Sequence, residues 1–411
     1  MNKLKRLPLL ATLTFALIIF SNCDISDSSS SIETPEIYEF TRNGESTVSF
    51  SGQTTRLKMA TELVQSIHDF DNSTSELLLQ MFRNEGLNGE DVAPFNNEEL
   101  NTSSKSIKSK VAASRDYFSA KTAVSAEIRS DFESWLTQVV EEVYPNKNTL
   151  AEPGVSGQIA DGNSVRYVNA QGFEYDQLVT KGLIGALMVD QMLNNYLSTS
   201  ILDEGTNRED NDSEVLVEGK NYTTMEHKWD EAYGYLFGNS ANPESPMATL
   251  GSDDVFLNKY FGRLDNDPDF EGIAQEVFDA FALGRAAIVA GDYELRNEQA
   301  AIIRSHISTV IGVRAVYYLN AGKEGLSNSS PDYGAIFHDL SEGYGFIYSL
   351  MFVRNPRSNE QVFTKAEIDS LLANLTQGDG LWEVSPATLD DMISNISAKF
   401  DFNLEHAINS N

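Results

Sequence analysis

Apolar residues recur at spacings of three and four over most of the chain, which places them on one face of a helix. The pattern predicts long helices over residues 57–69, 123–144, 175–197, 273–290, 297–319 and 386–408. Only 11 prolines occur, and they fall mainly between these blocks. We therefore expect an all-α fold, a duplicated helical bundle decorated with short β-hairpins.

Two short β-prone stretches predict the hairpins. Residues 38–40 and 46–50 flank the dipeptide Asn43-Gly44, and residues 158–168 surround Asp161-Gly162. Both dipeptides suit the positive φ angles of a tight turn. Each hairpin leads through a glycine into a long helical pattern. The polar, acidic segment 203–221 has no period and predicts a surface loop or a boundary between subdomains.

The N-terminus has the charge and hydropathy order of a secretory signal. Three basic residues, Lys3, Lys5 and Arg6, precede an apolar run at 7–20, which is shorter than the roughly twenty residues needed to cross a bilayer. The run ends in Phe-Ser-Asn-Cys23, which resembles the lipobox of bacterial envelope lipoproteins. We expect cleavage after residue 22 and acylation of Cys23; the alternative is an ordinary signal with a coincidental cysteine.

The surroundings of Cys23 favour the lipoprotein interpretation. Cys23 is the only cysteine, so no intramolecular disulfide or cysteine cluster can claim it. Residues 23–35 read as a flexible, serine-rich tether. The predicted parts are then a signal peptide at 1–22, this tether, a first helical unit at 36–215 and a second at 216–411, separate or packed as one body. The expected location is the cell envelope, anchored by lipid to the outer membrane, with the face left open.

The net charge of the chain limits the classes of binding partner. Removal of residues 1–22 takes away three basic and no acidic residues, so the formal charge changes from −31 to −34. An acidic surface most often means solubility alone, but it also repels nucleic acid and attracts cations. We expect no nucleic-acid partner and a membrane contact through the acyl anchor only.

An ungapped internal repeat is the most informative motif. The segment 227–237, HKWDEAYGYLF, aligns with the segment 338–348, HDLSEGYGFIY, and each follows a long helical pattern. On a helix, His227 and Glu231 lie within about 40° of each other, and Gly234 lies about 20° to the other side of the histidine. The equivalent residues of the second copy are His338, Glu342 and Gly345. We therefore expect a duplicated helix pair.

Three interpretations of this repeat are open. In the first, the glutamates accept hydrogen bonds from the histidines, and the helices cross at the glycines. In the second, His227, Glu231, His338 and Glu342 converge on a metal ion, iron or another divalent metal, or on a small ligand. In the third, one His–Glu pair performs general acid–base catalysis as a hydrolase, although the sequence offers no partner nucleophile.

Other chemistry is sparse in the sequence. It holds no H-E-x-x-H, C-x-x-C, phosphate-binding loop or G-x-S-x-G motif. His68, His306 and His406 stand alone in helical patterns and predict packed or surface histidines. One loop has the carboxylate spacing of a calcium site, with a phenylalanine where the sharp turn needs glycine; its candidate ligands are Asp265, Asp267, Asp269 and Glu276. The alternative is a plain loop in which Asp269 caps the next helix.

The lipobox-like start, the hairpin that leads into helices and the segment 226–235, EHKWDEAYGY, resemble an uncharacterised family of envelope lipoproteins, domain of unknown function 4856. That family would cover nearly all of residues 36–410 and is distantly similar to imelysin-like proteins. Imelysins are helical, duplicated envelope proteins linked to iron uptake and once classed as peptidases, with a G-x-H-x-x-E motif. Here His227 and Asp230 match that motif, whereas Met225 replaces its glycine, and Ser341 replaces its acid in the second copy.

This resemblance implies an accessory role in iron or haem acquisition beside envelope uptake proteins. We therefore expect an acylated envelope lipoprotein that acts as a binding or accessory component. The alternatives are an imelysin-type metal-dependent hydrolase and a structural or protein-interaction lipoprotein without a small ligand.

Overall fold

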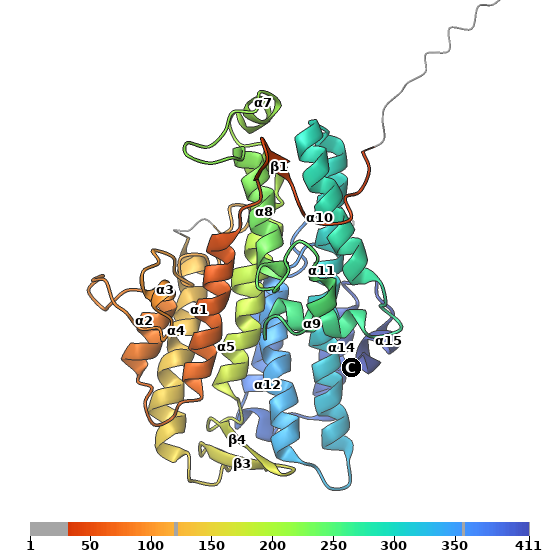
Figure 1. Cartoon of the computed structure of the whole chain (residues 1–411). Coiled ribbons are helices and arrows are strands. Elements are labelled where there is room, and N and C mark those ends of the chain that lie inside the picture. The colour runs from red at the N-terminus through yellow and green to blue at the C-terminus, as the bar shows by residue number, and fades with distance from the viewer. Residues whose placement is uncertain (1–31, 119–121, 356–357, 411) are drawn as a thin grey trace, which may run out of the picture. The chain divides into compact units, whose positions relative to one another are not determined.

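Long helices dominate the computed structural model, which describes residues 32–118, 122–355 and 358–410. The α-helices are α1 (Ser51–Ile67), α2 (Ser75–Arg83), α3 (Glu98–Asn101), α4 (Ala123–Gln138), α5 (Tyr175–Leu183), α6 (Thr199–Leu202), α7 (Asn207–Asp212), α8 (Thr224–Phe237), α9 (Leu257–Asp265), α10 (Ile273–Ala290), α11 (Tyr293–Ser327), α12 (Tyr333–Ser349), α13 (Lys365–Thr376), α14 (Pro386–Ser397) and α15 (Leu404–Asn409). Figure 1 shows the longer ones side by side, with α1, α4, α5, α12 and α11 along the body. The predicted all-α fold is confirmed.

Two helices continue as π-helical or 3₁₀ segments. α4 passes into a π-helical segment, η1 (Val139–Val143), and a 3₁₀ turn, η2 (Tyr144–Asn146). α5 passes into two π-helical segments, η3 (Ile184–Val189) and η4 (Met192–Tyr196). These extensions account for the full predicted helices at 123–144 and 175–197. Within η3, a Cβ on Gly185 would lie 2.5 Å from Ser349 Cα, so the backbone of α12 packs directly against this segment.

Two antiparallel hairpins are the strands of the described chain. In the first, β1 (Thr41–Arg42) pairs with β2 (Glu45–Ser46), and Asn43 and Gly44 both have positive φ, as the dipeptide predicts. In the second, β3 (Gly157–Asp161) pairs with β4 (Ser164–Val168), and the turn falls at residues 162–163. The β1–β2 hairpin precedes α1, and the β3–β4 hairpin precedes α5.

Two predictions from the pattern need correction. The block 386–408 is not one helix: α14 ends at Ser397, and α15 begins after Asn403, whose side chain accepts a hydrogen bond from the Glu405 amide at 2.8 Å. The apolar period continues across this break, so only the capping residue marks it.

The segment 203–221 is not all loop, because it contains α7. That short polar helix is held by Asn211, a buried side chain that donates to the Ile288 carbonyl at 2.7 Å. Apolar periodicity cannot reveal a helix that is anchored by an amide.

Residues Glu33–Asn411 cluster into one compact unit, so the helical parts expected on either side of residue 215 belong to one body. In the described part of the chain, no helix combines the length and the apolar character needed to cross a membrane. The predicted signal peptide, the predicted acylation site at Cys23 and most of the predicted tether lie outside the described residues.

The repeated motif lies on α8 and α12. α8 packs against α1, and α12 packs against α5, so each copy meets the helix that follows a hairpin. A Cβ on Gly234 would lie 2.4 Å from Phe50 Cβ, at the start of α1. A Cβ on Gly345 would lie 2.5 Å from Lys181 Cβ on α5. Both glycines thus lie at close contacts between helices, but the partners are the start of α1 and α5 rather than the helical pattern that directly precedes each copy in the sequence.

Candidate functional site

The histidine of the first copy is held by the segment between the first hairpin and α1. α8 begins with a capping box between Thr223 and Glu226, which fixes the turn that carries His227. His227 Nδ1 lies 2.9 Å from the Ser49 carbonyl, and the ring stacks on Tyr222. Burial lowers the pKa of His227, and the charge of Glu231 only partly opposes that effect. This histidine is set up to be neutral.

The glutamate of the first copy takes its hydrogen bonds from other residues. Gln53 Nε2 donates to Glu231 Oε1 at 3.0 Å, and Lys228 Nζ lies 2.8 Å from Oε2. His227 Nε2 is 3.9 Å from Oε2, which is too long for a hydrogen bond. Burial acts to raise the pKa of Glu231, but Lys228 and His227 lower it overall. The expected hydrogen bond between these two motif residues is therefore not formed.

A buried charge network lies behind the first copy. Arg285 on α10 is fully buried, and it lies 3.1 Å from Glu226 Oε1 and 3.1 Å from Asp230 Oδ1. Tyr38 Oη also donates to Asp230 at 2.7 Å. Burial raises the pKa of Asp230 to about 6 despite the charge of Arg285. This network joins the first hairpin, α8 and α10.

The second copy has a different set of partners. His338 Nδ1 lies 3.1 Å from Glu174 Oε2, at the start of α5. Burial acts to lower the pKa of His338, but the hydrogen bond and the charge of Glu174 outweigh it and raise the pKa. The protonated form of His338 is therefore favoured, in contrast to that of His227.

The second glutamate is also paired away from its own histidine. Lys181 Nζ lies 2.7 Å from Glu342 Oε1, and Tyr260 Oη donates to the same oxygen at 2.9 Å. The separation from His338 Nε2 is 4.0 Å. Although burial opposes ionisation, the charges of Lys181 and His338 lower the pKa of Glu342 to about 2. Glu342 is therefore a structural carboxylate.

The two copies share one anchoring contact. The Ser49 amide donates to Asp230 Oδ2 at 3.0 Å in the first copy, and the Glu174 amide donates to Ser341 Oγ at 3.0 Å in the second. Asp230 and Ser341 occupy the same position of the aligned motif, so Ser49 and Glu174 are equivalent as well. Each copy thus fixes the entry of the helix that follows a hairpin. The two copies therefore contact the hairpin–helix segments that precede them in the same way.

The four proposed metal ligands do not form one centre. His227 and Glu231 contact the first hairpin segment and α1, whereas His338 and Glu342 contact α5 and α9. Over residues 32–118, 122–355 and 358–410, no three His, Cys, Asp or Glu side chains are grouped so as to hold a metal ion. A shared site would require the two copies to face each other. Instead, α8 packs against α1 and α12 packs against α5, the helices that follow the two hairpins.

The candidate calcium ligands are likewise engaged elsewhere. Asp265 Oδ1 accepts from the Gly272 amide at 3.1 Å and the Ala274 amide at 2.9 Å, so Asp265, rather than the expected Asp269, caps α10. The other three carboxylates make separate contacts: Asp267 with the Asp269 amide, Asp269 with His406 and Glu276 with His306. The carboxylates do not converge as a calcium loop requires. The lone His68 is more than half exposed and lies 3.5 Å from Asp176.

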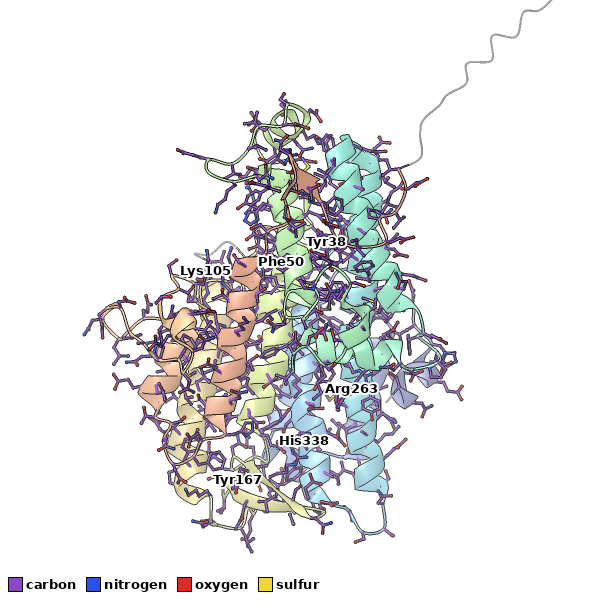
Figure 2. The ribbon with its side chains drawn as sticks, viewed as in Figure 1. Tyr38, Phe50, Lys105, Tyr167, Arg263 and His338 are labelled. Carbon is purple, nitrogen blue, oxygen red and sulfur yellow. The ribbon has the colours of Figure 1, made fainter. Side chains whose placement is uncertain are left out.

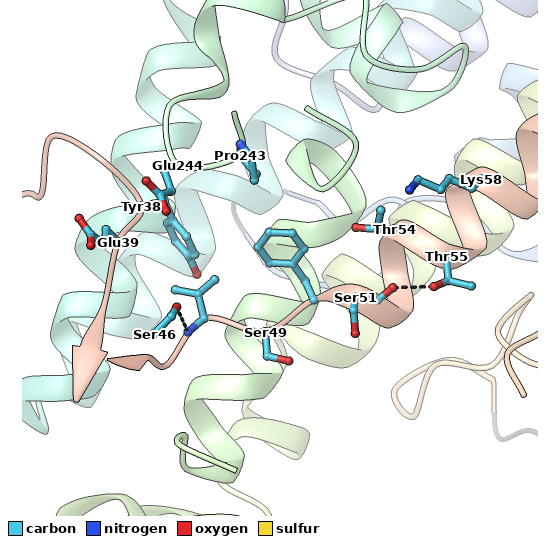
Figure 3. A pocket seen from close by; sticks show the side chains of 12 residues that line it. Tyr38, Glu39, Ser46, Ser49, Ser51, Thr54, Thr55, Lys58, Pro243 and Glu244 are labelled. Carbon is cyan, nitrogen blue, oxygen red and sulfur yellow. Dashed lines mark hydrogen bonds between the residues drawn. The ribbon is translucent and has the colours of Figure 1, made fainter. Parts of the chain in front are cut away.

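Each hairpin unit borders a cavity. The first, of about 500 Å³, lies between the segment 46–58, Tyr38 and the residues Pro243 and Glu244. Figure 3 shows Tyr38 and Glu244 on one side of it and Thr54 and Lys58 on the other. Its charged side chains are exposed, so water solvates them.

The second cavity, of about 480 Å³, has a different lining. Its walls come from the end of α1, from η1, from β4 and from the start of α5. Figure 2 shows Tyr167, which lines it, and Tyr38, which lines the first cavity, towards different ends of the body. Among its lining side chains are Phe70, Val143, Arg166, Tyr167, Glu174 and Asp176.

Glu174 distinguishes the second cavity from the first. Its side chain is only 4% exposed, and Oε1 has no hydrogen-bond partner. Among the described residues that line either cavity, no other side chain carries a buried polar atom in this state. Burial raises the pKa of Glu174, Asp176 adds to this, and His338 opposes it. An unpartnered buried carboxylate oxygen is costly in a folded protein, so the cavity beside it is the candidate site.

Sequence reasoning missed Glu174. The only signal was its place directly before a helix that follows a predicted hairpin, and no motif marks such a position. The contact with His338 spans 164 residues, which no local pattern predicts.

Fold and site together define an all-α protein built from two hairpin–helix copies, with a cavity at a buried carboxylate in the second. The chain belongs to the family described as Domain of unknown function (DUF4856), whose model matches residues 35–403. This confirms the expected family. No curated protein matches the chain, and neither does any solved structure.

Proposed function

We propose that this protein is a lipid-anchored binding component of the bacterial cell envelope, and that its ligand site is the second cavity. The anchor is argued from the signal-like residues 1–22 and from Cys23. The binding role is argued from Glu174, a buried carboxylate whose Oε1 lacks a partner at a cavity of about 480 Å³. The sequence-predicted metal ligands His227, Glu231, His338 and Glu342 are engaged with protein groups, so we expect an organic ligand rather than a metal.

The lining of this cavity suits a small molecule. Phe70 and Tyr167 meet edge to face with ring centres 4.5 Å apart, which gives the wall a fixed shape. Tyr175 Oη donates to Glu142 Oε2 at 2.8 Å, so its ring is held as well. A fixed apolar wall with a few polar groups is typical of ligand pockets. The surroundings of Glu174 are therefore those of a preformed site.

A cavity-filling variant tests this proposal. Val165 lies on β4, is about half exposed and lines the second cavity, so Val165→Trp fills the space without disturbing the core. Val48→Trp fills the first cavity and serves as the matched control. In a thermal-shift screen of small organic molecules on the full-length protein, we expect hits that Val165→Trp removes and Val48→Trp keeps. Hits that survive Val165→Trp, or a screen without hits, would contradict the proposed site.

The anchor has its own test. Cys23→Ala removes the sulfur to which acyl chains attach, so we expect the protein to move from the membrane to the soluble fraction and to lose incorporation of a labelled fatty acid. Replacing a nearby serine, Ser29→Ala, gives a control with the same location in the tether. Equal labelling of the wild type and Cys23→Ala would refute lipid anchoring.

A further inference from the structure

We infer that the second cavity takes an organic ammonium group, a protonated amine carried on an apolar or aromatic body, with Glu174 as the carboxylate that receives it. This inference rests on the proposed binding function and specifies its ligand. It requires three things of the structure: a carboxylate that needs a donor, a local field that favours a cation, and walls that accept the rest of the molecule.

The need for a donor comes from Glu174 itself. Its Oε2 is used by His338 at 3.1 Å, and its amide is used by Ser341, but Oε1 has no partner. An ionised carboxylate only accepts hydrogen bonds, so a ligand group that contacts Oε1 must donate. A charged N–H donor forms a shorter and stronger bond to a carboxylate than a neutral donor does. An ammonium group therefore fits this oxygen best.

The charges around the cavity favour a cation. Glu174 and Asp176 both line it, and Arg166 is the lining cation nearest to Glu174. His338 lies 3.1 Å from Glu174 Oε2, and His68 lies 3.5 Å from Asp176, so neither histidine contacts Glu174 Oε1. Arg166 is already held by Asp161, with Nε 2.7 Å from Oδ2, and its Nε stays 4.0 Å from Glu174 Oε1. An anionic ligand would meet two carboxylates at short range. A cation is attracted by both.

The walls accept an aromatic or aliphatic body. Phe70, Tyr167 and Tyr175 contribute rings, and Val139 and Val143 of η1 contribute branched aliphatic groups. Aromatic faces attract organic cations, and apolar walls favour burial of the hydrocarbon part. Among the described residues, Glu174, His338 and their neighbours do not form a group of three side chains that could hold a metal ion.

Arg166 covers the unpartnered oxygen. The Arg166 side chain is 30% exposed and is held on one side by Asp161, so it can swing away without breaking the core. Binding of an ammonium group then replaces a cation at 4.0 Å with one in hydrogen-bond contact with Glu174. Removal of this guanidinium should consequently strengthen cation binding, whereas a merely structural carboxylate would lose stability and gain no affinity.

Three phenyl-bearing probes of similar size and different charge test the inference by calorimetric titration of the full-length protein at pH 7: phenethylammonium, 2-phenylethanol and phenylacetate. We expect phenethylammonium to bind one site at least about tenfold more tightly than the alcohol, and the carboxylate not to bind. Glu174→Gln should weaken the ammonium probe by about tenfold or more, and Arg166→Met should strengthen it. Glu39→Gln, which removes an exposed carboxylate from the first cavity, should leave the affinity unchanged.

The outcomes separate the ligand class from the proposed function. Binding of the alcohol or the carboxylate as tightly as the ammonium, with loss in Val165→Trp, would overturn the ammonium inference and leave a binding site in the second cavity. Unchanged ammonium binding in Glu174→Gln, or no ammonium binding to the wild type, would also overturn the inference. Arg166→Met keeps the test decisive if Glu174→Gln fails to fold, because unchanged or weaker binding in Arg166→Met contradicts the role given to that arginine.

Discussion

The two copies of the motif pack against their neighbouring helices in the same way, but their buried charged side chains are paired differently. In the first, Arg285 neutralises Glu226 and Asp230 in the core, and every motif carboxylate has partners. In the second, the equivalent positions hold Phe337 and Ser341, so this network has no counterpart. Its charges lie instead in Glu174, His338, Glu342 and Lys181, and one oxygen of Glu174 is unpartnered. The first copy therefore serves stability, and we propose that the second, with its unpartnered carboxylate oxygen, serves binding.

The largest expected effect is on stability, when the buried cation of each copy is removed. Arg285→Met removes the buried cation that Glu226 and Asp230 share, and Asp230 then has no cation within hydrogen-bond distance, whereas Glu226 keeps Arg42 at 3.1 Å. We expect a loss of about 3–5 kcal/mol in the free energy of unfolding. Lys181→Met leaves one carboxylate, Glu342, which still accepts from Tyr260, so its loss should be smaller. Urea denaturation measures both. Equal losses in the two variants would contradict the comparison.

The glycine crossings should be alike in both copies. Gly234→Ala and Gly345→Ala place a Cβ 2.4 Å and 2.5 Å from neighbouring Cβ atoms, so each should cost about 1–3 kcal/mol through overpacking. The control is Gly343→Ala on α12, where the nearest atom is 3.3 Å away and the helix gains propensity. Thermal unfolding of the three variants tests this. If Gly234→Ala or Gly345→Ala were as stable as Gly343→Ala, close helix packing at that glycine would be contradicted.

The smallest expected effect is a difference in pH dependence. His338 has a raised pKa in the folded protein, so its contribution to stability is present at acid pH and is lost as pH rises through that pKa. His227 has a lowered pKa, so its contribution is present above the ordinary value and is lost as pH falls. Relative to wild type, His338→Gln should therefore cost more stability at pH 5.5 than at pH 8, and His227→Gln the reverse.

Each of these slopes is limited to about 1.4 kcal/mol per pH unit, because one proton is involved. Urea unfolding at the two pH values measures them, and Glu39→Gln provides a variant in which neither histidine is touched. Slopes of the same sign for His227→Gln and His338→Gln would contradict the assignment of one neutral and one charged histidine.

The sequence predicted much of the fold for physical reasons that are local. The turn at Asn43-Gly44 and the extent of α10 follow from turn chemistry and apolar period, which act over a few residues. The break before α15 depends on one capping residue, Asn403, in an unbroken apolar pattern, so the prediction failed there. α7 failed for the opposite reason, because its anchor is polar.

The site could be predicted only in part. Gly234 and Gly345 of the repeat both lie at close contacts with another helix, in keeping with the close packing that glycine in a helix indicates, but the repeat did not identify those helices. The repeat did not show which segments of the chain the two copies pack against. Aligned sequences place the two histidines at the same position, but their partners, Ser49 and Glu174, come from segments far away in the chain. The partner of a titratable group, and hence its charge state, is a property of tertiary packing.

Amide hydrogen exchange with and without saturating phenethylammonium reports on both copies in one measurement. If the ligand binds at the second copy, exchange should slow in residues 165–177, at β4 and the start of α5, and stay unchanged in residues 46–58, which line the first cavity. Slower exchange confined to residues 46–58, or no change in residues 165–177 at saturation, would contradict the assignment of binding to the second copy.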